Sequence, residues 1–127
     1  MNDEIKYLSL NDIEAYKIAF NLSNLVWDII LKWDYFAKDT VGKQFVRSVD
    51  SISANIAEGF GRYHKKDKIK FYRYSYGSLF ESLDWVEKSK TRNLVTVKEY
   101  DYINNELQKL PKSIHHLINY TNTKLKF

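Results

Sequence analysis

Helix-breaking residues are scarce in this sequence, and their scarcity constrains the fold more than any other feature. Four glycines and one proline occur in 127 residues, while apolar residues recur at three- and four-residue spacing over long stretches. The strict alternation of apolar and polar residues that marks a half-buried strand is absent. The sequence therefore predicts an all-α fold, and its length fits a single domain that spans residues 1–127.

The apolar periodicity divides into four predicted helices. These cover residues 11–32, 40–60, 65–90 and a last segment that begins after Thr96. Ser9 and Asp39 are candidate N-caps of the first two, and Thr96 with Glu99 forms a capping box for the fourth. Because the connections are short, neighbouring helices should be antiparallel. We expect an up-down-up-down four-helix bundle.

The few breakers lie at informative positions. Gly59 and Gly61 close the second predicted helix, and we expect them to end it in a left-handed conformation. Pro111 interrupts the fourth apolar stripe, and we expect a kink there because the hydrogen bond to the carbonyl of Leu107 is lost.

Two predicted helices carry more apolar surface than a lone bundle needs. The first has a stripe of Ile18, Leu22, Leu25, Ile29 and Trp33, and a nearly opposite stripe of Ile13, Phe20, Trp27 and Leu31. The third directs Ile69, Tyr72, Tyr76, Leu79, Leu83 and Val86 to the core, and carries Phe71, Tyr74 and Trp85 elsewhere. We expect a homo-oligomer that uses these two helices. The alternative is a monomer with scattered surface aromatics.

The second predicted helix also has an unusual polar stripe. It consists of Gln44, Arg47, Ser51, Asn55, Glu58 and Arg62, and its last two members are spaced for an ion pair one turn apart. Small polar side chains in such a row indicate a packed, hydrogen-bonded contact with another helix. An ordinary solvated face is the alternative.

Positive charge is concentrated in one short segment. Between residues 62 and 73 there is one acid, Asp67, and six basic residues: Arg62, Lys65, Lys66, Lys68, Lys70 and Arg73. The segment has a net charge of +5, so the rest of the chain carries −1 of the formal total of +4. Local basicity of this kind is typical of a site for a polyanion. The alternative is a solvated basic face without a partner.

Within this segment, Lys66, Lys70 and Arg73 share one helical stripe, and the nearby Tyr63 is placed to stack on a base. Together with Arg47 from the second helix, the six basic residues are our candidates for contacts with RNA or DNA.

The sequence offers little for catalysis. Walker, GxGxxG and HExxH motifs are absent, and there is no cysteine. The histidines are His64, His115 and His116, and the last two diverge by about 100° on a helix, which prevents them from converging on one metal ion. We therefore predict a protein that is not an enzyme and needs no cofactor. Without a long apolar run or a basic leader, we also expect it to be cytoplasmic, with no membrane partner.

The segments SISANIAEGFGR (residues 51–62) and YGSLFES (residues 76–82) resemble a known family. It comprises the bacterial four-helix-bundle proteins encoded in intervening sequences of large-subunit ribosomal RNA genes, often described as ribosomal-protein-like. The residues that match its structural motif are Gln44, Ser51, Asn55, Glu58, Gly59, Gly77, Ser78 and Glu81. The chain departs from the pattern at Val46, where the family has a basic residue, and at Lys68, where it has an apolar one.

The resemblance implies a left-handed bundle that assembles into a ring-like homopentamer without established enzymatic activity. A related branch resembles the accessory protein of diversity-generating retroelements, which binds nucleic acid and a reverse transcriptase. Two functions therefore stay open at this point. One is direct binding of RNA or DNA by an oligomer, and the other is a protein-interaction scaffold that recruits a reverse transcriptase or a ribosomal component.

Overall fold

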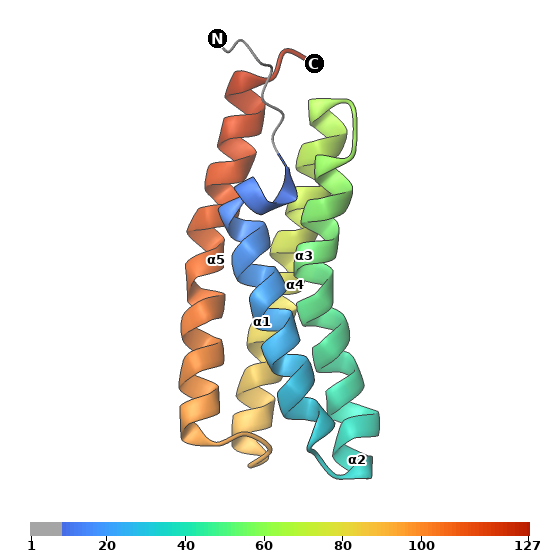
Figure 1. Ribbon diagram of the computed structural model, residues 1–127, viewed down its shortest axis with the longest axis vertical. Coiled ribbons are helices and arrows are strands. Elements are labelled where there is room, and N and C mark those ends of the chain that lie inside the picture. The colour runs from blue at the N-terminus through green and yellow to red at the C-terminus, as the bar shows by residue number, and fades with distance from the viewer. Residues whose placement is uncertain (1–8) are drawn as a thin grey trace.

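The computed structural model describes residues 9–127, and its helices lie side by side along the longest axis (Figure 1). Within these residues there is no strand, and the long helices are α1 (Glu14–Leu31), α3 (Lys43–Phe60), α4 (Lys65–Thr91) and α5 (Val97–Lys124). The predicted all-α fold is therefore confirmed. The α3–α4 turn and the tail after α5 lie at one end, which we call the turn end; the short α2 (Tyr35–Ala37) and the α4–α5 loop lie at the opposite end, the α2 end (Figure 1).

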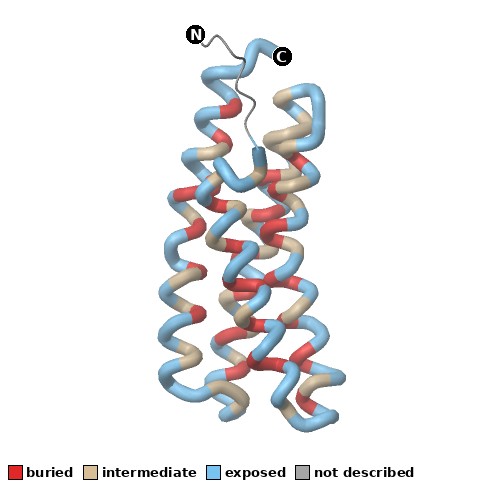
Figure 2. The backbone as a smooth tube through the Cα atoms, viewed as in Figure 1, coloured by how far each residue is buried: buried red, intermediate tan, exposed pale blue. Residues whose placement is uncertain are grey.

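The core lies where the four long helices face one another (Figure 2). The predicted stripes of α3 and α5 are confirmed, since Phe45, Ile52, Ile103 and Leu110 are fully buried. The prediction for α1 was only partly right. Leu22 and Ile29 are buried, but the rest of the core side of α1 is formed by Ala15, Ala19, Val26 and Ile30. The small alanines let α1 approach its neighbours closely, and Ile18, Leu25 and Trp33 are left half-buried.

Buried serines join α3 to α4. The Ser82 hydroxyl donates to the Ser48 hydroxyl at 3.0 Å, and the Ser75 hydroxyl donates to the carbonyl of Ile52 at 2.7 Å. Because their own hydroxyls are bonded, these polar side chains are buried without an unpaired group. The two contacts also fix how far α4 is shifted along α3. Because the helices are antiparallel, Ser82 lies beside Ser48, and the earlier Ser75 lies beside the later Ile52.

The helical run that contains α3 begins earlier than predicted. Asp34, and not Asp39, is the N-cap, because its carboxylate accepts a hydrogen bond of 3.0 Å from the backbone N–H of Ala37. From α2 the chain continues through a π-helical turn, η2 (Lys38–Gly42), into α3. Asp39 lies inside this turn and pairs with Lys43 at 3.0 Å.

The glycines after α3 do not have the predicted left-handed conformation. No glycine has a positive φ within residues 9–127, and Gly61 has a φ of −78°. Gly59 has a different role: a Cβ atom there would lie 2.7 Å from Cε1 of Tyr72 and 2.9 Å from the backbone oxygen of Lys68. Gly59 therefore permits the close approach of α3 to α4. The left-handed residue is Asn93 in the α4–α5 loop, with a φ of 58°.

The N-terminal ends of α1 and α5 differ in how well they match the predicted caps. Ser9 does form a capping box with Asp12, but it caps a 3-10 turn, η1 (Leu10–Asp12), and α1 begins only at Glu14. The predicted box of Thr96 and Glu99 is confirmed, with hydrogen bonds of 2.9 and 3.0 Å between each side chain and the other residue's backbone. The helix that it starts continues through Pro111 to Lys124.

Candidate nucleic-acid interface

The predicted basic residues at the turn end divide into a structural group and an unpaired group. Lys65 belongs to the structural group. Its ammonium donates to the carbonyls of Asn122 and Leu125 at 3.0 and 3.1 Å, and its backbone N–H donates to the carbonyl of Phe127. A cation at this position satisfies the last carbonyls of α5 and complements the negative end of the helix dipole. Lys65 thereby fastens the C-terminal tail to the start of α4.

Lys68 has the equivalent role for α3. Its ammonium donates to the carbonyl of Phe60, the last residue of that helix, at 2.7 Å, and lies 5.4 Å from the centre of the Phe60 ring. Burial lowers the pKa of Lys68 below its usual value. The apolar residue that the family has here is thus replaced by a lysine that caps α3.

Arg62 is held on two sides. Its guanidinium pairs with the Glu58 carboxylate at 2.7 Å, which confirms the predicted contact one turn apart, and its Cζ lies 4.6 Å from the centre of the Phe71 ring. A cation held by a carboxylate and an aromatic face has a reduced capacity for a further anion.

The remaining basic residues of the segment, Lys66, Lys70 and Arg73, form what we call the cationic stripe. All three are exposed, and in the described part of the chain no side chain forms an ion pair with them. They border a hollow of about 730 Å³ between the start of α4 and the end of α5, which also includes Tyr74 and Asn122. The structure therefore brings together three unpaired cations, an aromatic ring and an open surface.

The fold adds basic residues that sequence reasoning missed. Because Lys65 binds the carbonyls of Leu125 and Phe127, the tail lies against the start of α4 and brings Lys124 and Lys126 to the turn end. The ring of Phe127 is stacked on Tyr63, with 6.4 Å between the ring centres. The two lysines stand close together in the sequence, which is a signal that could have found them, but nothing in the sequence placed them beside residues 62–73.

Arg47 is not part of this surface. It lies near the start of α3, fifteen residues before Arg62, and at 1.5 Å per residue the two are separated by about 22 Å along the helix. Its side chain borders a groove between α1 and α3 near the α2 end. Arg47 therefore lies apart from the other candidate residues, and its contact with RNA or DNA stays a prediction.

The motif residues of α3 mostly bond within their own helix. The Ser51 hydroxyl donates to the Arg47 carbonyl at 2.7 Å, and the Asn55 amide donates to the Ser51 carbonyl at 2.9 Å. The expected interhelical hydrogen bonds of this stripe are therefore not formed by these side chains. The buried serines Ser48, Ser75 and Ser82 provide them instead.

On α4 the motif residues are Gly77, Ser78 and Glu81. A Cβ atom at Gly77 would have no neighbour within 4 Å, so no close packing within one copy requires this glycine. The Ser78 carbonyl lies 2.9 Å from the Ser82 hydroxyl and is its alternative acceptor to Ser48, and Glu81 accepts from the indole of Trp85 at 3.3 Å.

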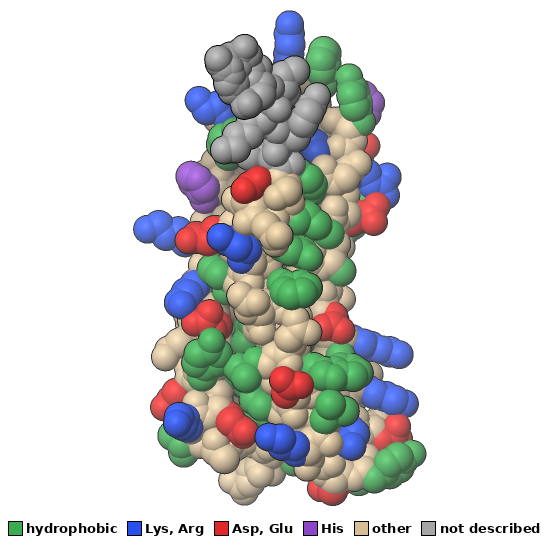
Figure 3. Space-filling view, viewed as in Figure 1, with side chains coloured by type: hydrophobic (Ala, Val, Ile, Leu, Met, Phe, Trp, Pro, Cys, Tyr) green, Lys and Arg blue, Asp and Glu red, His purple; other side chains and the backbone are tan. Residues whose placement is uncertain are grey.

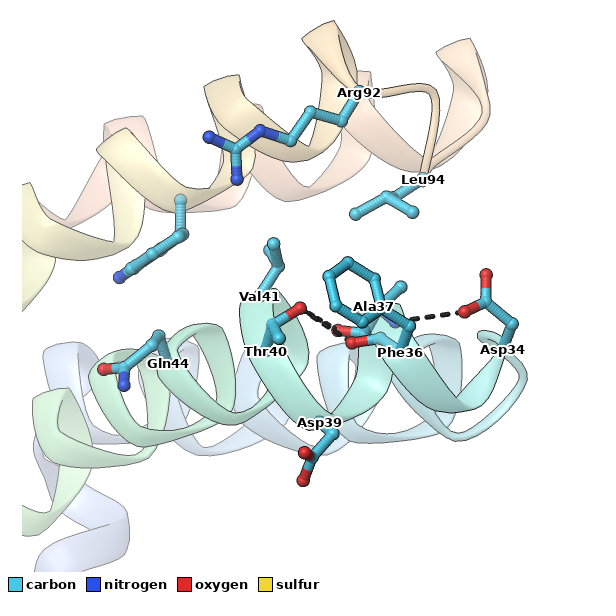
Figure 4. A pocket seen from close by; sticks show the side chains of 10 residues that line it. Asp34, Phe36, Ala37, Asp39, Thr40, Val41, Gln44, Arg92 and Leu94 are labelled. Carbon is cyan, nitrogen blue, oxygen red and sulfur yellow. Dashed lines mark hydrogen bonds between the residues drawn. The ribbon is translucent and has the colours of Figure 1, made fainter.

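Gln44 borders a second hollow, of about 640 Å³, at the α2 end (Figure 4). Figure 4 shows Arg92 reaching over Val41 and Gln44 from the α4 side, while the Asp34 carboxylate is turned back to cap α2. The hollow combines apolar walls with polar groups, but within the described residues no metal-binding group of histidines, cysteines or carboxylates is present.

The fold and the turn end together define a class, a small helical-bundle protein with a cationic surface at one end; within residues 9–127 no group of metal-binding side chains is present. None of the helices in residues 9–127 has the length and hydrophobicity to span a bilayer. Residues 11–116 match the family of the 23S rRNA-intervening sequence protein. The chain belongs to this family, which confirms the resemblance of its motifs.

A solved structure shows a similar fold. It is a protein with unknown function from the S23 ribosomal protein family of Bacteroides thetaiotaomicron, with a TM-score of 0.71 and 21% sequence identity. The similarity covers 82% of this chain and 97% of that chain. No curated protein matches this sequence.

Proposed function

We propose that this protein binds RNA or DNA through the cationic stripe of Lys66, Lys70 and Arg73. One observation carries the proposal: these three cations are exposed and unpaired, whereas Arg62, Lys65 and Lys68 of the same segment are bound to protein groups. A row of free cations on a rigid helix is held at a fixed spacing and loses little entropy when it binds phosphates. Lys124 and Lys126 add to the field at the same end.

The mode of binding follows from the groups that are present. Lysine and arginine neutralise phosphates and release condensed counterions, which gives affinity that falls with added salt and carries no sequence readout. Tyr74 is half exposed beside the stripe, and its ring is nearly perpendicular to that of Phe71, with 5.4 Å between the ring centres. The exposed part of this ring offers a stacking platform for an unpaired base.

Self-assembly belongs to the proposed function. A ring of identical copies repeats the cationic stripe around its rim, so weak contacts with one long nucleic acid add up to a strong one. Half-exposed apolar side chains support this part: Phe20, Trp27 and Leu31 on α1, and Phe80 on α4, are between 48% and 51% exposed. A homopentamer, and a left-handed up-down-up-down form of the bundle, are the specific expectations from the family.

The test uses charge reversal with a matched control. In the test variant, Lys66, Lys70 and Arg73 are changed to glutamate together. The control changes three other exposed lysines, Lys17, Lys98 and Lys112, to glutamate, so that net charge falls equally. Fluorescence anisotropy with a labelled single-stranded RNA and a labelled DNA duplex should show at least a hundredfold weaker binding for the test variant and a smaller loss for the control.

Equal loss in both variants, or binding by neither wild type nor variants at low salt, would overturn the proposal. In the latter case the scaffold function gains support if the wild-type protein retains a protein partner after nuclease treatment. Circular dichroism spectra must show that both variants keep their helices.

A further inference from the structure

The groove between α1 and α3 near the α2 end combines an apolar floor with a basic rim. Its volume is about 320 Å³. The floor consists of Trp27, Ile30, Leu31, Gly42 and Val46, and the rim of Lys38, Lys43 and Arg47. We call this surface the groove face. The space-filling view shows several hydrophobic side chains in the lower half of the molecule, with acidic side chains among them and basic side chains projecting along the α3 edge (Figure 3).

The groove face is too apolar to be an ordinary solvated surface. Trp27 is 51% exposed and Leu31 is 50% exposed, although each presents a large hydrophobic side chain. Adjacent exposed side chains of this size, rimmed by charge, mark a contact surface. Because the rim is cationic, an occupant must supply apolar groups together with acids.

The outer side of α4 supplies this combination. Phe80 is 51% exposed and Trp85 is half buried, and acids lie between and beside them at Glu81, Asp84 and Glu87. We call the exposed surface formed by these five residues the acidic ridge. Lys88 also lies here, since it pairs with Asp84 and its ammonium is 4.7 Å from the centre of the Trp85 ring. Three acids and one lysine leave the ridge with a net charge of −2, opposite in sign to the rim of the groove face.

The two surfaces also lie at the same level of the bundle. The hydrogen bond between Ser48 and Ser82 places these residues side by side. Arg47 directly precedes Ser48 on α3, and Glu81 directly precedes Ser82 on α4. A contact between the two surfaces of different copies therefore needs no shift along the bundle axis.

Two charges on each surface have no ionic partner within residues 9–127: Lys38 and Arg47 on the groove face, and Glu81 and Glu87 on the acidic ridge. Glu87 is turned toward α5, where it accepts a hydrogen bond from the Tyr100 hydroxyl, so Arg47 and Glu81 are the pair at the same level. Lys43 is paired with Asp39, and Asp84 is paired with Lys88. By contrast, no ion pair within residues 9–127 includes Arg47 or Glu81, and Glu81 accepts only from the Trp85 indole.

We infer that the groove face of one copy receives the acidic ridge of the next copy, with Arg47 paired to Glu81 of the neighbour. The inference rests on the proposed self-assembly and deepens it. The contact is head-to-tail, because the two surfaces are different. Repeated head-to-tail contacts give a closed ring when the rotation between successive copies completes a turn, and an open filament when it does not; the closed ring is the form that the proposed self-assembly requires. Gly77 fits this arrangement, because it has no side chain and therefore leaves room for a neighbouring copy to approach α4 one turn before Glu81.

A charge swap tests the pair. Arg47→Glu or Glu81→Arg places like charges in every contact and should weaken association by roughly tenfold or more in sedimentation velocity experiments. The double variant Arg47→Glu with Glu81→Arg restores opposite charges and should recover most of the loss. Lys112→Glu is the control on α5 and should sediment as wild type. Single variants without effect, or a double variant that fails to recover, would overturn the inference.

Crosslinking gives an independent readout, because the chain contains no cysteine. Arg47→Cys combined with Glu81→Cys, treated with a short bismaleimide, should give a ladder of covalent oligomers that ends at the ring size. Each single cysteine should give no ladder, and neither should Lys112→Cys with Glu81→Cys. A wild-type monomer at micromolar concentration overturns self-assembly itself. Assembly without a ladder overturns only the interface, and neither result depends on nucleic-acid binding.

Discussion

Replacing Gly59 with alanine tests the close approach of α3 and α4. The added Cβ atom would lie 2.7 Å from Cε1 of Tyr72 and 2.9 Å from both Cδ1 of Tyr72 and the backbone oxygen of Lys68. Tyr72 is 2% exposed, so its ring is surrounded by packed protein groups. The Lys68 oxygen belongs to the helix backbone. The two helices must therefore separate locally.

The magnitude follows from two opposing terms. Overpacking a tight core contact costs about 1–3 kcal/mol, and alanine in a helix gains about 1 kcal/mol over glycine. Because both obstructing groups are held in place, we expect the upper part of the first range and a net loss of about 1–2 kcal/mol. Gly61→Ala is the matched control two residues on. Its Cβ atom would have ordinary contacts of 3.6 Å, and its φ of −78° suits any residue.

Urea denaturation followed by circular dichroism measures the free energy of unfolding of each variant. Gly59→Ala should be less stable than wild type, and Gly61→Ala should be within about 0.5 kcal/mol of it. The opposite order, with Gly61→Ala the more damaging, would refute the reasoning. It would show that a left-handed helix end, and not helix packing, is what requires glycine here.

Three further changes test local contacts. Lys68→Met should lower the free energy of unfolding by about 1 kcal/mol, because the end of α3 loses its cap, yet leave nucleic-acid affinity close to that of wild type. Asp34→Ala should cost about 1 kcal/mol and Asp39→Ala much less, because Asp34 alone caps α2; chemical denaturation of the pair checks this order. Burial raises the pKa of Tyr72 to about 12, although a hydrogen bond with Thr121 opposes the shift. The stability that this tyrosine contributes is complete below its unfolded pKa of about 10 and should be lost as pH rises through 12. In Tyr72→Phe, pH-dependent denaturation should show that loss reduced.

Periodicity was sufficient to predict the four long helices, because few breakers interrupt them and the stripes of α3 and α5 are regular, but it missed the short helical turns η1, α2 and η2. The same rule placed Ile18, Leu25 and Trp33 in the α1 core. It failed there because the hydrophobicity of a residue does not show how closely its helix approaches the neighbouring helices. The small side chains of Ala15 and Ala19 allow α1 to pack closely through that side, and both residues are buried. The serines that join α3 to α4 were missed for a related reason. A buried serine depends on a partner in another helix, and a single helical pattern does not contain that information.

The basic segment was correctly located, but the roles within it were not separable by sequence. Lysines at adjacent positions look alike until the fold shows that Lys65 and Lys68 reach the ends of α5 and α3. Arg47 shares a stripe with Arg62 on one helix, yet the length of that helix separates them. Lys124 and Lys126 reached the same end through a tertiary contact of the chain terminus.

The salt dependence of binding tests the central claim most directly, namely that the cationic stripe contacts phosphates. The affinity for a DNA duplex should be measured between low and physiological salt for wild type and for the variant with Lys66, Lys70 and Arg73 changed to glutamine. The slope of log K against log salt should become shallower by about 1 for each cation removed, or about 3 in all per bound protomer. An unchanged slope would show that these side chains do not contact the nucleic acid and would contradict the account.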